Sequence, residues 1–384
     1  MITDKLGNHV EILSGFAFKS NRFNDDGKGL PLVRIRDVKP RKSETFYDGE
    51  FEERYVLSDG DMLVGMDGEF NCARWNGGPA LLNQRVCRIR ATSAKLDEQY
   101  LFWFLPKVLK EIEEVSNFVT VKHLSSKQIN EIEIPLPPME EQKRIAAILD
   151  QADDIRRKRQ HAIDRLNQLP QVLYIEMFGD VLRGTHKHNL CSIEELCSVI
   201  TDCLHTTPAH FNEPNSFPSI RSSELQGGFI DLANAKYVSQ DEYVQRIQRH
   251  KPVRGDIIYC REGARYGNVG LVLDGMTPCL GQRTMLFQAN EAVALSNYLW
   301  ATLCSENIFQ QAVNAAGGAA SPHVNIKDIR KFKSTMPPIR EQKIFSDMVD
   351  NIITKRGLFA EQCAKFESLF SSLQHRAFAG GLCR

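Results

Sequence analysis

Several features that would assign this chain to a membrane or secreted class are missing from its sequence. No stretch approaches the ~18 consecutive apolar residues that a membrane-spanning helix needs. Residues 1–15 also lack the basic start and apolar core of a secretory signal. We therefore expect a cytoplasmic protein that contacts no membrane.

Cysteine pairs and catalytic histidine patterns are missing as well. None of the ten cysteines stands in a C-x-x-C pair, so buried or surface thiols are expected rather than disulfides or a zinc site. The ten histidines are scattered, and their neighbours suggest no Cys–His or Ser–His–Asp arrangement. The sequence thus predicts no catalytic residues, no metal site and no hydrolase.

An excess of basic charge is the third absence. Lysine plus arginine and aspartate plus glutamate number 48 each, so the bulk attraction that many nucleic-acid binders exert on phosphate is lacking. Any binding to DNA must come from local patches or be shared with a partner. The hydrophobic content of 42% and the length of 384 residues predict a folded chain with two or more domains.

What the sequence does contain is a long internal repeat. The segment IPLPPMEEQK at 134–143 matches STMPPIREQK at 334–343, with an offset of 200 (342 − 142 = 200). Two earlier pairs of segments also match, 58–65 with 253–260 and 82–87 with 280–285. Between them lie short β-branched or aromatic runs broken by Gly, Asn and Asp, which are typical of strands joined by turns. Each copy is therefore predicted to be a mixed α/β globule followed by a helix.

The proline pair in each copy predicts where the helix begins. Proline disfavours helix in the residue before it but is tolerated in a first turn, so helices should begin near 139 and 339. Their apolar residues follow a heptad phase. The first set is Ile145, Ile148, Ala152, Ile155, Ala162, Leu166 and Leu169; the second is Phe345, Met348, Ile352, Lys355, Phe359, Gln362, Phe366 and Leu369. We predict that the helices pack together, and that Pro170 interrupts the first; the alternative is that each helix covers only its own domain.

This arrangement resembles the specificity (S) subunit of type I restriction–modification enzymes. The residues that carry the resemblance are PLPPMEEQKRI at 135–145, its degenerate copy MPPIREQK at 336–343 and the closing LQHRAFAGGL at 373–382. The resemblance implies an α+β (mixed α/β) fold with two tandem target-recognition domains, each followed by a long amphipathic helix, the helices forming a coiled-coil spacer. The domains are placed at 1–136 and 181–336, and the helical spacers at 137–180 and 337–384.

The resemblance also implies a function and partners. Each recognition domain would read one half of a split, asymmetric site in double-stranded DNA, and the helices would dock two methyltransferase (modification) subunits. Restriction or translocase subunits join such complexes. No cofactor is expected in this chain, whereas S-adenosylmethionine and ATP are expected in the partner subunits. A helix of about 30 residues spans roughly 45 Å, or about 13 base pairs.

Candidate DNA-reading residues are sought where the two copies differ, because shared features cannot distinguish two half-sequences. By this argument Gln84–Arg85 and Gln282–Arg283 are scaffold or phosphate groups, and Gly60–Asp61 and Gly255–Asp256 are turns. The loops 66–75 and 261–268, with basic patches at 31–44 and 246–265, are the better candidates. The predicted DNA-binding residues are Arg34, Arg36, Lys39, Arg41, Glu69, Asn71, Arg74, Lys122, His123, Arg221, Arg261, Arg265, Tyr266, Asn268 and His323. Any single arginine among them could equally be an ordinary surface charge.

The sequence leaves two alternative functions, a DNA methyltransferase and an assembly scaffold. A self-sufficient DNA methyltransferase would need a glycine-rich cofactor loop and an Asn/Asp-Pro-Pro-aromatic motif, and Leu136-Pro-Pro-Met and Met336-Pro-Pro-Ile lack both the polar first residue and the aromatic one. An assembly scaffold would use its helices to join other subunits without reading DNA. It would show no sequence-dependent binding even with its partners present.

Overall fold

The computed structural model describes residues 2–115, 123–318 and 322–379. The chain divides into two compact units. Unit 1 comprises Met1–Arg157 and Ala364–Arg384, and unit 2 comprises Lys158–Cys363. Both boundaries lie within long helices, α4 (Met139–Phe178) and α10 (Ile339–Phe378), which begin at the two residues that the proline pairs predict.

Unit 1 is built on a four-stranded antiparallel sheet. Its strand order is β2 (Val10–Ser14), β10 (Val86–Ala91), β7 (Met62–Gly65) and β8 (Cys72–Arg74). Successive side chains of a strand point to opposite faces. Accordingly Met62 and Val64 join the core beneath α2 (Glu98–Val115), whereas Leu63 packs into a second core on the other face. The sheet is therefore covered on both sides.

The second sheet of unit 1 is formed by four strands that precede β7 in the chain and one that follows it. Its order is β3 (Phe23–Asn24), β5 (Phe46–Tyr47), β4 (Leu30–Val33), β9 (Ala80–Leu82) and β6 (Val56–Leu57). The smaller elements are β1 (Thr3–Lys5), which pairs with β11 (Glu133–Pro135), and the short helices α1 (Ile35–Val38) and α3 (Ser126–Asn130).

Unit 2 repeats this plan with an extended main sheet. Its order is β13 (Cys197–Asp202), β21 (Thr284–Ala289), β18 (Ile257–Cys260), β19 (Val269–Leu271), β16 (Gly228–Ile230) and β15 (Leu225–Gln226). The smaller sheets are β17 (Lys236–Tyr237), β14 (Pro218–Ile220) and β20 (Cys279–Leu280), and the pair β12 (Leu190–Ser192) and β22 (Lys333–Thr335). The helices before α10 are α5 (Ile193–Leu196), α6 (Gln240–Arg246), α7 (Ser296–Leu303), α8 (Glu306–Ala316) and α9 (Ile326–Lys331).

A buried glutamine explains why the proline motif is repeated. Gln142 donates from its amide nitrogen to the carbonyls of Lys95 (2.8 Å) and Pro137 (2.9 Å), and its amide oxygen accepts from the Asp97 N–H (2.9 Å). Gln342 makes the same three contacts at 2.8–2.9 Å, with Val293, Pro337 and Leu295. Because buried polar groups need partners, each glutamine fixes the start of its helix on its own unit.

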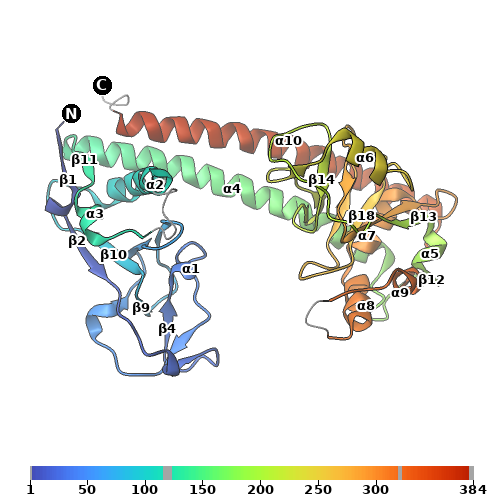
Figure 1. Cartoon of the computed structure of the whole chain (residues 1–384), viewed down its shortest axis with the longest axis horizontal. Coiled ribbons are helices and arrows are strands. Elements are labelled where there is room, and N and C mark those ends of the chain that lie inside the picture. Colours follow the sequence, from blue (N-terminus) through green and yellow to red (C-terminus); the bar gives the residue numbers. More distant parts are fainter. Residues whose placement is uncertain (1, 116–122, 319–321, 380–384) are drawn as a thin grey trace. The chain divides into compact units, whose positions relative to one another are not determined.

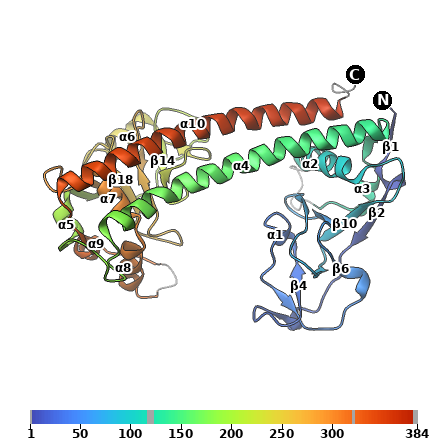
Figure 2. The same cartoon turned by 180° about the vertical axis from the view of Figure 1, so that it is seen from behind.

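The end of each long helix packs in the other repeat's unit. In unit 1, the Phe370 and Phe378 rings of α10 lie 5.7 Å from Trp103 and 5.2 Å from Tyr100. In unit 2, Tyr174 and Phe178 of α4 lie 5.6 and 5.0 Å from Tyr298. Figures 1 and 2 show, in each unit, half of α4 beside half of α10. Each unit therefore has a core completed by both helices.

The predicted heptad seam is wrong in detail. Among the predicted positions, Ile155, Leu169 and Leu369 are 44%, 39% and 66% exposed, whereas Ile145, Phe345 and Ile352 are buried. The apolar positions that matter are those near the helix ends, because these face the globular parts of the units. The stretch between them carries charge, and Arg156 pairs there with Asp153 at 2.6 Å.

Pro170 does not interrupt the first helix either. Residues 139–178 are continuously helical, and Pro170 is buried on the face that α4 turns toward the core of unit 2. An interior proline costs a helix about 3 kcal/mol or more. The burial of Tyr174 and Phe178 one and two turns further on offsets this cost.

Neither a membrane helix nor a metal cluster is found among the described residues. Within 2–115, 123–318 and 322–379 no helix is long and apolar enough to cross a membrane, and no group of three or more His, Cys, Asp or Glu side chains could hold a metal ion. The cysteines in these ranges are free thiols. Burial raises the pKa of the Cys87 and Cys279 thiols to about 12, so they are packing groups rather than nucleophiles.

Candidate nucleic-acid interface

In unit 1 an acid holds a histidine and an arginine on the surface. Asp67 follows β7, and its carboxylate accepts from His123 Nδ1 (2.6 Å) and from Arg85 Nη1 (3.0 Å). The Asp67 side chain is 18% exposed, whereas those of Arg85 and His123 are 65% and 60% exposed. Two potentially cationic groups are thus presented to solvent by one partly buried carboxylate.

Unit 2 contains the equivalent acid and histidine. Glu262 follows β18, and its Oε1 lies 3.2 Å from His323 Nδ1 and 2.8 Å from Arg261 Nη2. Arg261 Nη1 lies 3.2 Å from His323 Nε2, so the geometry fits a neutral ring that accepts from Arg261 and donates to Glu262. The three side chains close a ring of interactions.

The Gly–Asp pairs before β7 and β18 are turns, as predicted. Gly60 and Gly255 have φ values of 95° and 89°. Asp61 accepts from the Ser58 N–H and Asp256 from the Val253 N–H, both at 2.9 Å. These shared turns fix where β7 and β18 begin. They thereby also fix where Asp67 and Glu262, which follow these strands, lie on the surface.

The first basic patch lies on α1 and the turn after it. Arg36 is 66% exposed, while Arg34 is partly buried and donates to the Thr45 hydroxyl. Lys39 and Arg41 line a surface cavity of 580 Å³ together with Glu69, Phe70 and Asn71. The structure therefore brings four predicted residues, Lys39, Arg41, Glu69 and Asn71, to one depression of unit 1.

Asp37 sits among the arginines of this patch. Burial raises the pKa of its carboxyl to about 6, against the opposing effect of the Arg36 guanidinium. Its carboxylate accepts from the Arg34 N–H at 2.9 Å and so caps the short helix α1. The same carboxylate lies 4.0 Å from Arg34 Nε and 3.7 Å from Arg36 Nε, so its charge partly offsets theirs.

Other predicted residues of unit 1 lie elsewhere. Arg74 donates to the Gly60 carbonyl (2.8 Å) and to Gln99 Oε1 (2.8 Å), which ties β8 to α2. This placement favours a structural role. Lys122 lies outside the described residues.

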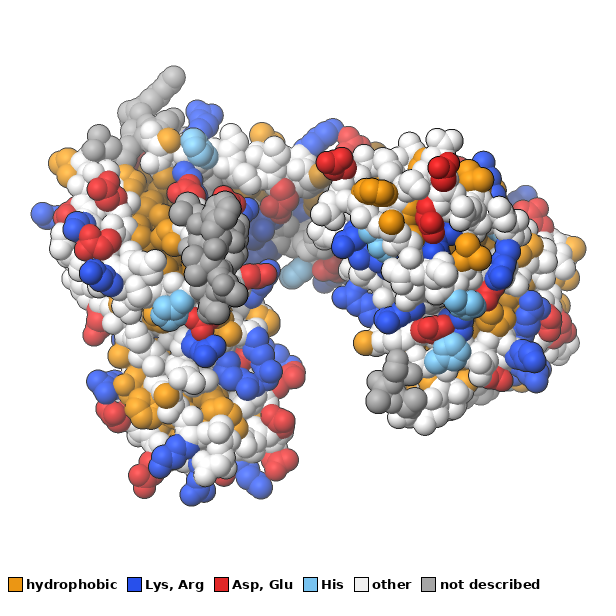
Figure 3. All heavy atoms as spheres, viewed as in Figure 1, with side chains coloured by type: hydrophobic (Ala, Val, Ile, Leu, Met, Phe, Trp, Pro, Cys, Tyr) orange, Lys and Arg blue, Asp and Glu red, His pale blue; other side chains and the backbone are white. Residues whose placement is uncertain are grey.

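The predicted residues of unit 2 fall into two places. Arg221 lines a cavity of 270 Å³, and the exposed Arg265 donates nearby to the Ser223 carbonyl (3.3 Å). Tyr266 packs on Phe309, with ring centroids 5.7 Å apart, and Asn268 donates to the Leu225 carbonyl (2.8 Å). Figure 3 shows Lys and Arg side chains gathered with histidines on one face of this unit.

The second basic patch is only partly a surface patch. The Arg246 side chain is fully buried and donates to the Leu204 carbonyl (3.2 Å), so its assignment to a phosphate patch is wrong. Arg261 is only 5% exposed. A base contact by Arg261 stays a prediction, which its burial disfavours. Arg254 pairs at the surface with Asp274 (3.0 Å).

The comparison with protein families decides what these duplicated units are. The family described as the type I restriction modification DNA specificity domain matches residues 3–167 and 189–362, one match for each repeat. The chain belongs to this family. The predicted resemblance to type I specificity subunits is thereby confirmed.

Relatives within the specificity-subunit family span almost the whole chain. The type I restriction enzyme EcoBI specificity subunit of Escherichia coli is 29% identical over 97% of this chain and 84% of its own length. The MjaVIII specificity subunit of Methanocaldococcus jannaschii is 21% identical over 83% of this chain and 79% of its own.

Solved structures show the same fold. The S subunit of a type I system from M. genitalium covers 98% of this chain and 96% of its own, with a TM-score of 0.52 and 13% identity. A chain from a structure on complex assembly of a type I system covers 98% and 97%, with a TM-score of 0.51 and 16% identity. The predicted α+β fold with tandem domains and long helices is confirmed.

Sequence reasoning assigned Arg85 and Arg283 to scaffold or phosphate and left them out of the predicted site. In this specificity subunit Arg85 contacts Asp67 of the acid–histidine pair, and the exposed Arg283 lines a 270 Å³ cavity of unit 2. Two sequence features could have identified them. One is the Gln-Arg pair that follows a strand in both copies, and the other is the pair of histidines, His123 and His323, that lie 200 residues apart (323 − 123 = 200). Only the fold brings Arg85 and His123 to the same carboxylate.

Replacing Asp67 with asparagine should strengthen the binding of duplex DNA of any sequence. The substitution Asp67→Asn releases Arg85 and His123 from a competing carboxylate, so we expect a severalfold gain in affinity at low salt and a slope of log K against log salt that is steeper by about 1. Fluorescence anisotropy with a random-sequence duplex measures both. The control is Glu131→Gln, which frees Lys5 from a surface pair at 2.6 Å and changes net charge equally. Equal effects of the two variants would contradict the prediction.

Proposed function

We propose that this chain is the non-catalytic DNA-reading subunit of a type I restriction–modification complex, and that each unit reads one half of a split, asymmetric site. The membership of both repeats in the DNA specificity family is the observation that carries this proposal. The alternative is a helical assembly scaffold that does not read sequence.

The geometry of the two units supports reading by loops beside a shared contact. Asp67–His123 and Glu262–His323 occupy equivalent places after β7 and β18. The loops that follow them differ in length and chemistry, with six residues at 66–71 before β8 and eight at 261–268 before β19. Phosphate contacts position a protein and base contacts specify the sequence, so this division suits two readers of different half-sites.

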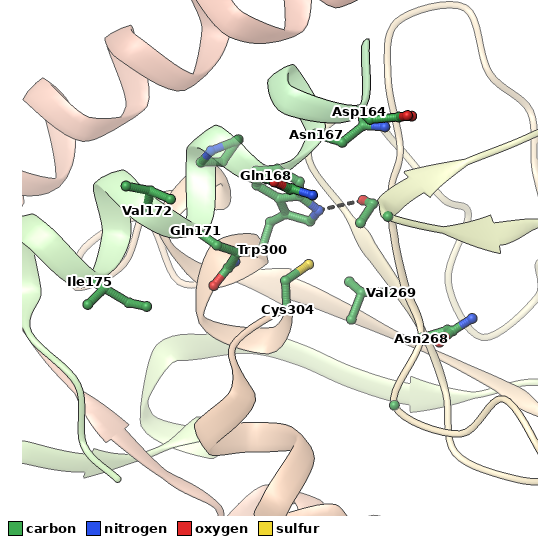
Figure 4. A pocket seen from close by; sticks show the side chains of 14 residues that line it. Asp164, Asn167, Gln168, Gln171, Val172, Ile175, Asn268, Val269, Trp300 and Cys304 are labelled. Atoms are coloured by element: carbon green, nitrogen blue, oxygen red, sulfur yellow. Dashed lines mark hydrogen bonds between the residues drawn. The ribbon is translucent and has the colours of Figure 1, made fainter. Parts of the chain in front are cut away.

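The long helices are proposed to dock two methyltransferase subunits, with restriction or translocase subunits joining the complex. In unit 2 a groove of 760 Å³ runs beside α4, where Val172 and Ile175 are 56% and 48% exposed. Figure 4 shows its lining from α4 on one side and from Trp300 and Cys304 on the other, with Trp300 bonded to the Gly228 carbonyl. Exposed apolar groups on a helix suit a protein partner. S-adenosylmethionine and ATP would bind in those partner subunits.

The test is to co-express this chain with the methyltransferase encoded beside it and to map adenine methylation by single-molecule sequencing. We expect a split motif with a fixed gap. Replacing residues 1–136 with the corresponding domain of a relative should change one half of the motif only. If a stable complex binds its cofactor but methylates no defined motif, the reading function is contradicted and the scaffold alternative takes its place.

A further inference from the structure

The two units differ in what holds the arginine of the Gln-Arg pair. In unit 1 Arg85 is bound to Asp67. Arg283 is the equivalent residue, because the N–H of Met66 donates to the Arg85 carbonyl (2.8 Å) just as the N–H of Arg261 donates to that of Arg283 (3.0 Å). In unit 2 the acid is taken by Arg261 instead, and no ion pair or side-chain hydrogen bond joins Arg283 to another described residue. Unit 2 has Arg261 where unit 1 has Met66, and with Arg261 on the acid, Arg283 has no ion-pair partner among the described residues.

Arg283 borders a concave, donor-rich site in unit 2, which we name the arginine pocket. This is the 270 Å³ cavity lined by Arg221 and Arg283, with Thr207, His210, Ser222 and Ser223 supplying hydroxyl and imidazole groups. Its described lining contains no carboxylate. Thr207 donates to the side-chain oxygen of Gln282 at 2.5 Å, which fixes the residue before Arg283.

Arg221 is held so that part of its guanidinium stays available. Its Nε and Nη2 donate to Glu224 at 3.1 and 2.6 Å, and Glu224 is 2% exposed. Nη1 forms no hydrogen bond with any residue that the structure describes, and the Arg221 side chain keeps 32% of its surface exposed. A planar guanidinium anchored on one edge can present the other edge to an anion.

His210 forms part of the pocket wall and lies close enough to Arg221 to be affected by its charge. The pKa of His210 is lowered first by burial and next by the Arg221 guanidinium. Its Nε2 lies 3.0 Å from the Ser219 hydroxyl, so the ring is fixed at the pocket wall. The Arg221 contribution, rather than the burial, is the part that an anion in the pocket would share with opposite sign.

We propose that the arginine pocket receives a phosphodiester group of duplex DNA, so that unit 2 has a backbone anchor that unit 1 lacks. Phosphates project from the duplex surface and fit a concave donor site, whereas base edges are recessed in the grooves and need a side chain that protrudes. The ligand is an anionic oxygen group, for which Arg283 supplies the charge and Arg221 the orientation. This inference rests on the proposed function.

The first experiment compares the chain in its methyltransferase complex with the variant Arg283→Ala. Binding to the mapped site and to a random-sequence duplex is measured against salt. We expect both affinities to fall by the same factor, about tenfold, and the salt slope to become shallower by about 1. Arg254→Ala removes the same charge from an exposed pair of unit 2, and Arg85→Ala removes the equivalent residue of unit 1; each should cost less than about threefold.

A second experiment identifies the source of the anion. Single neutral methylphosphonates are placed along the half-site of unit 2. One position should weaken binding by the wild-type complex about as much as Arg283→Ala does, and should not weaken the variant further. If inorganic phosphate competes but no position has this effect, the pocket takes a free anion and the proposal is overturned.

Two other outcomes would also overturn the proposal. A relaxed motif in one half-site would mean that Arg283 reads a base, and an unchanged affinity would mean that the pocket is not used. Arg283→Lys retains the charge and checks that any loss is not a folding defect. If the wild-type complex has no motif at all, the proposed function fails, yet the random-sequence duplex still reports on the pocket.

Discussion

Replacing Phe178 with alanine should lower the free energy of unfolding of unit 2 by about 3–5 kcal/mol. Phe178 is the last residue of α4 and is 0% exposed, and its ring centroid is 5.0 Å from that of Tyr298 and 5.5 Å from that of Phe345. The loss combines the transfer free energy of the ring with the cavity that it leaves. Urea unfolding, followed by hydrogen exchange of peptides from each unit, measures the effect.

The chain offers matched controls for this prediction. Phe378→Ala removes the equivalent ring of α10, which packs on Tyr100 and Phe104, and should destabilise unit 1 instead. Val172→Ala changes an exposed residue of the same helix, and should cost under about 1 kcal/mol. A Phe178→Ala variant that exchanges faster in unit 1 than in unit 2 would contradict the assignment of α4 to two cores.

Replacing Asp256 with alanine should destabilise unit 2 by a similar amount, about 3–5 kcal/mol. The carboxylate is 1% exposed and accepts from the Val253 N–H (2.9 Å), His250 Nε2 (2.8 Å) and Gln288 Nε2 (3.2 Å). Its removal leaves three donors without their shared buried acceptor, and loosens the turn that sets the register of β18. Thermal and urea unfolding would show the loss.

The comparison variant for Asp256 is an exposed acid of the same unit. Asp274 is 75% exposed in its pair with Arg254, so Asp274→Ala should change the free energy of unfolding by less than about 1 kcal/mol. Asp256→Asn keeps an acceptor for the Val253 N–H and should lie between the two. Equal stability of Asp256→Ala and Asp274→Ala would show that the buried turn contributes nothing specific.

Features set by neighbouring residues could be predicted from the sequence. The proline pairs predict helix starts at Met139 and Ile339, and the Gly60–Asp61 and Gly255–Asp256 pairs predict turns, because each depends on a few adjacent backbone angles. The repeat itself predicts two similar units. The seam was less accessible: Ile155 fits the heptad phase but is exposed, since burial depends on which globular surface each helix turn faces.

The candidate site was predictable only in parts. His123 and the Gln84–Arg85 pair both appear in the sequence argument, but nothing in their spacing shows that one carboxylate, Asp67, holds His123 and Arg85 together. That requires the register of β7 against β10, in which Val86 pairs with Gly65. The argument that shared residues cannot distinguish two half-sequences treats Arg85 and Arg283 alike, but their environments differ because Met66 in unit 1 corresponds to Arg261 in unit 2.

The division of each long helix between two cores has a consequence for synthesis on the ribosome. The aromatic surface of unit 1 around Tyr100 and Trp103 is covered by Phe370 and Phe378, which emerge more than 260 residues later (370 − 103 = 267). Unit 2, by contrast, has all of its residues by 363. Unit 1, which is translated first, is therefore the last to be completed. A premature stop between 364 and 370 would remove core residues from unit 1 while leaving unit 2 intact.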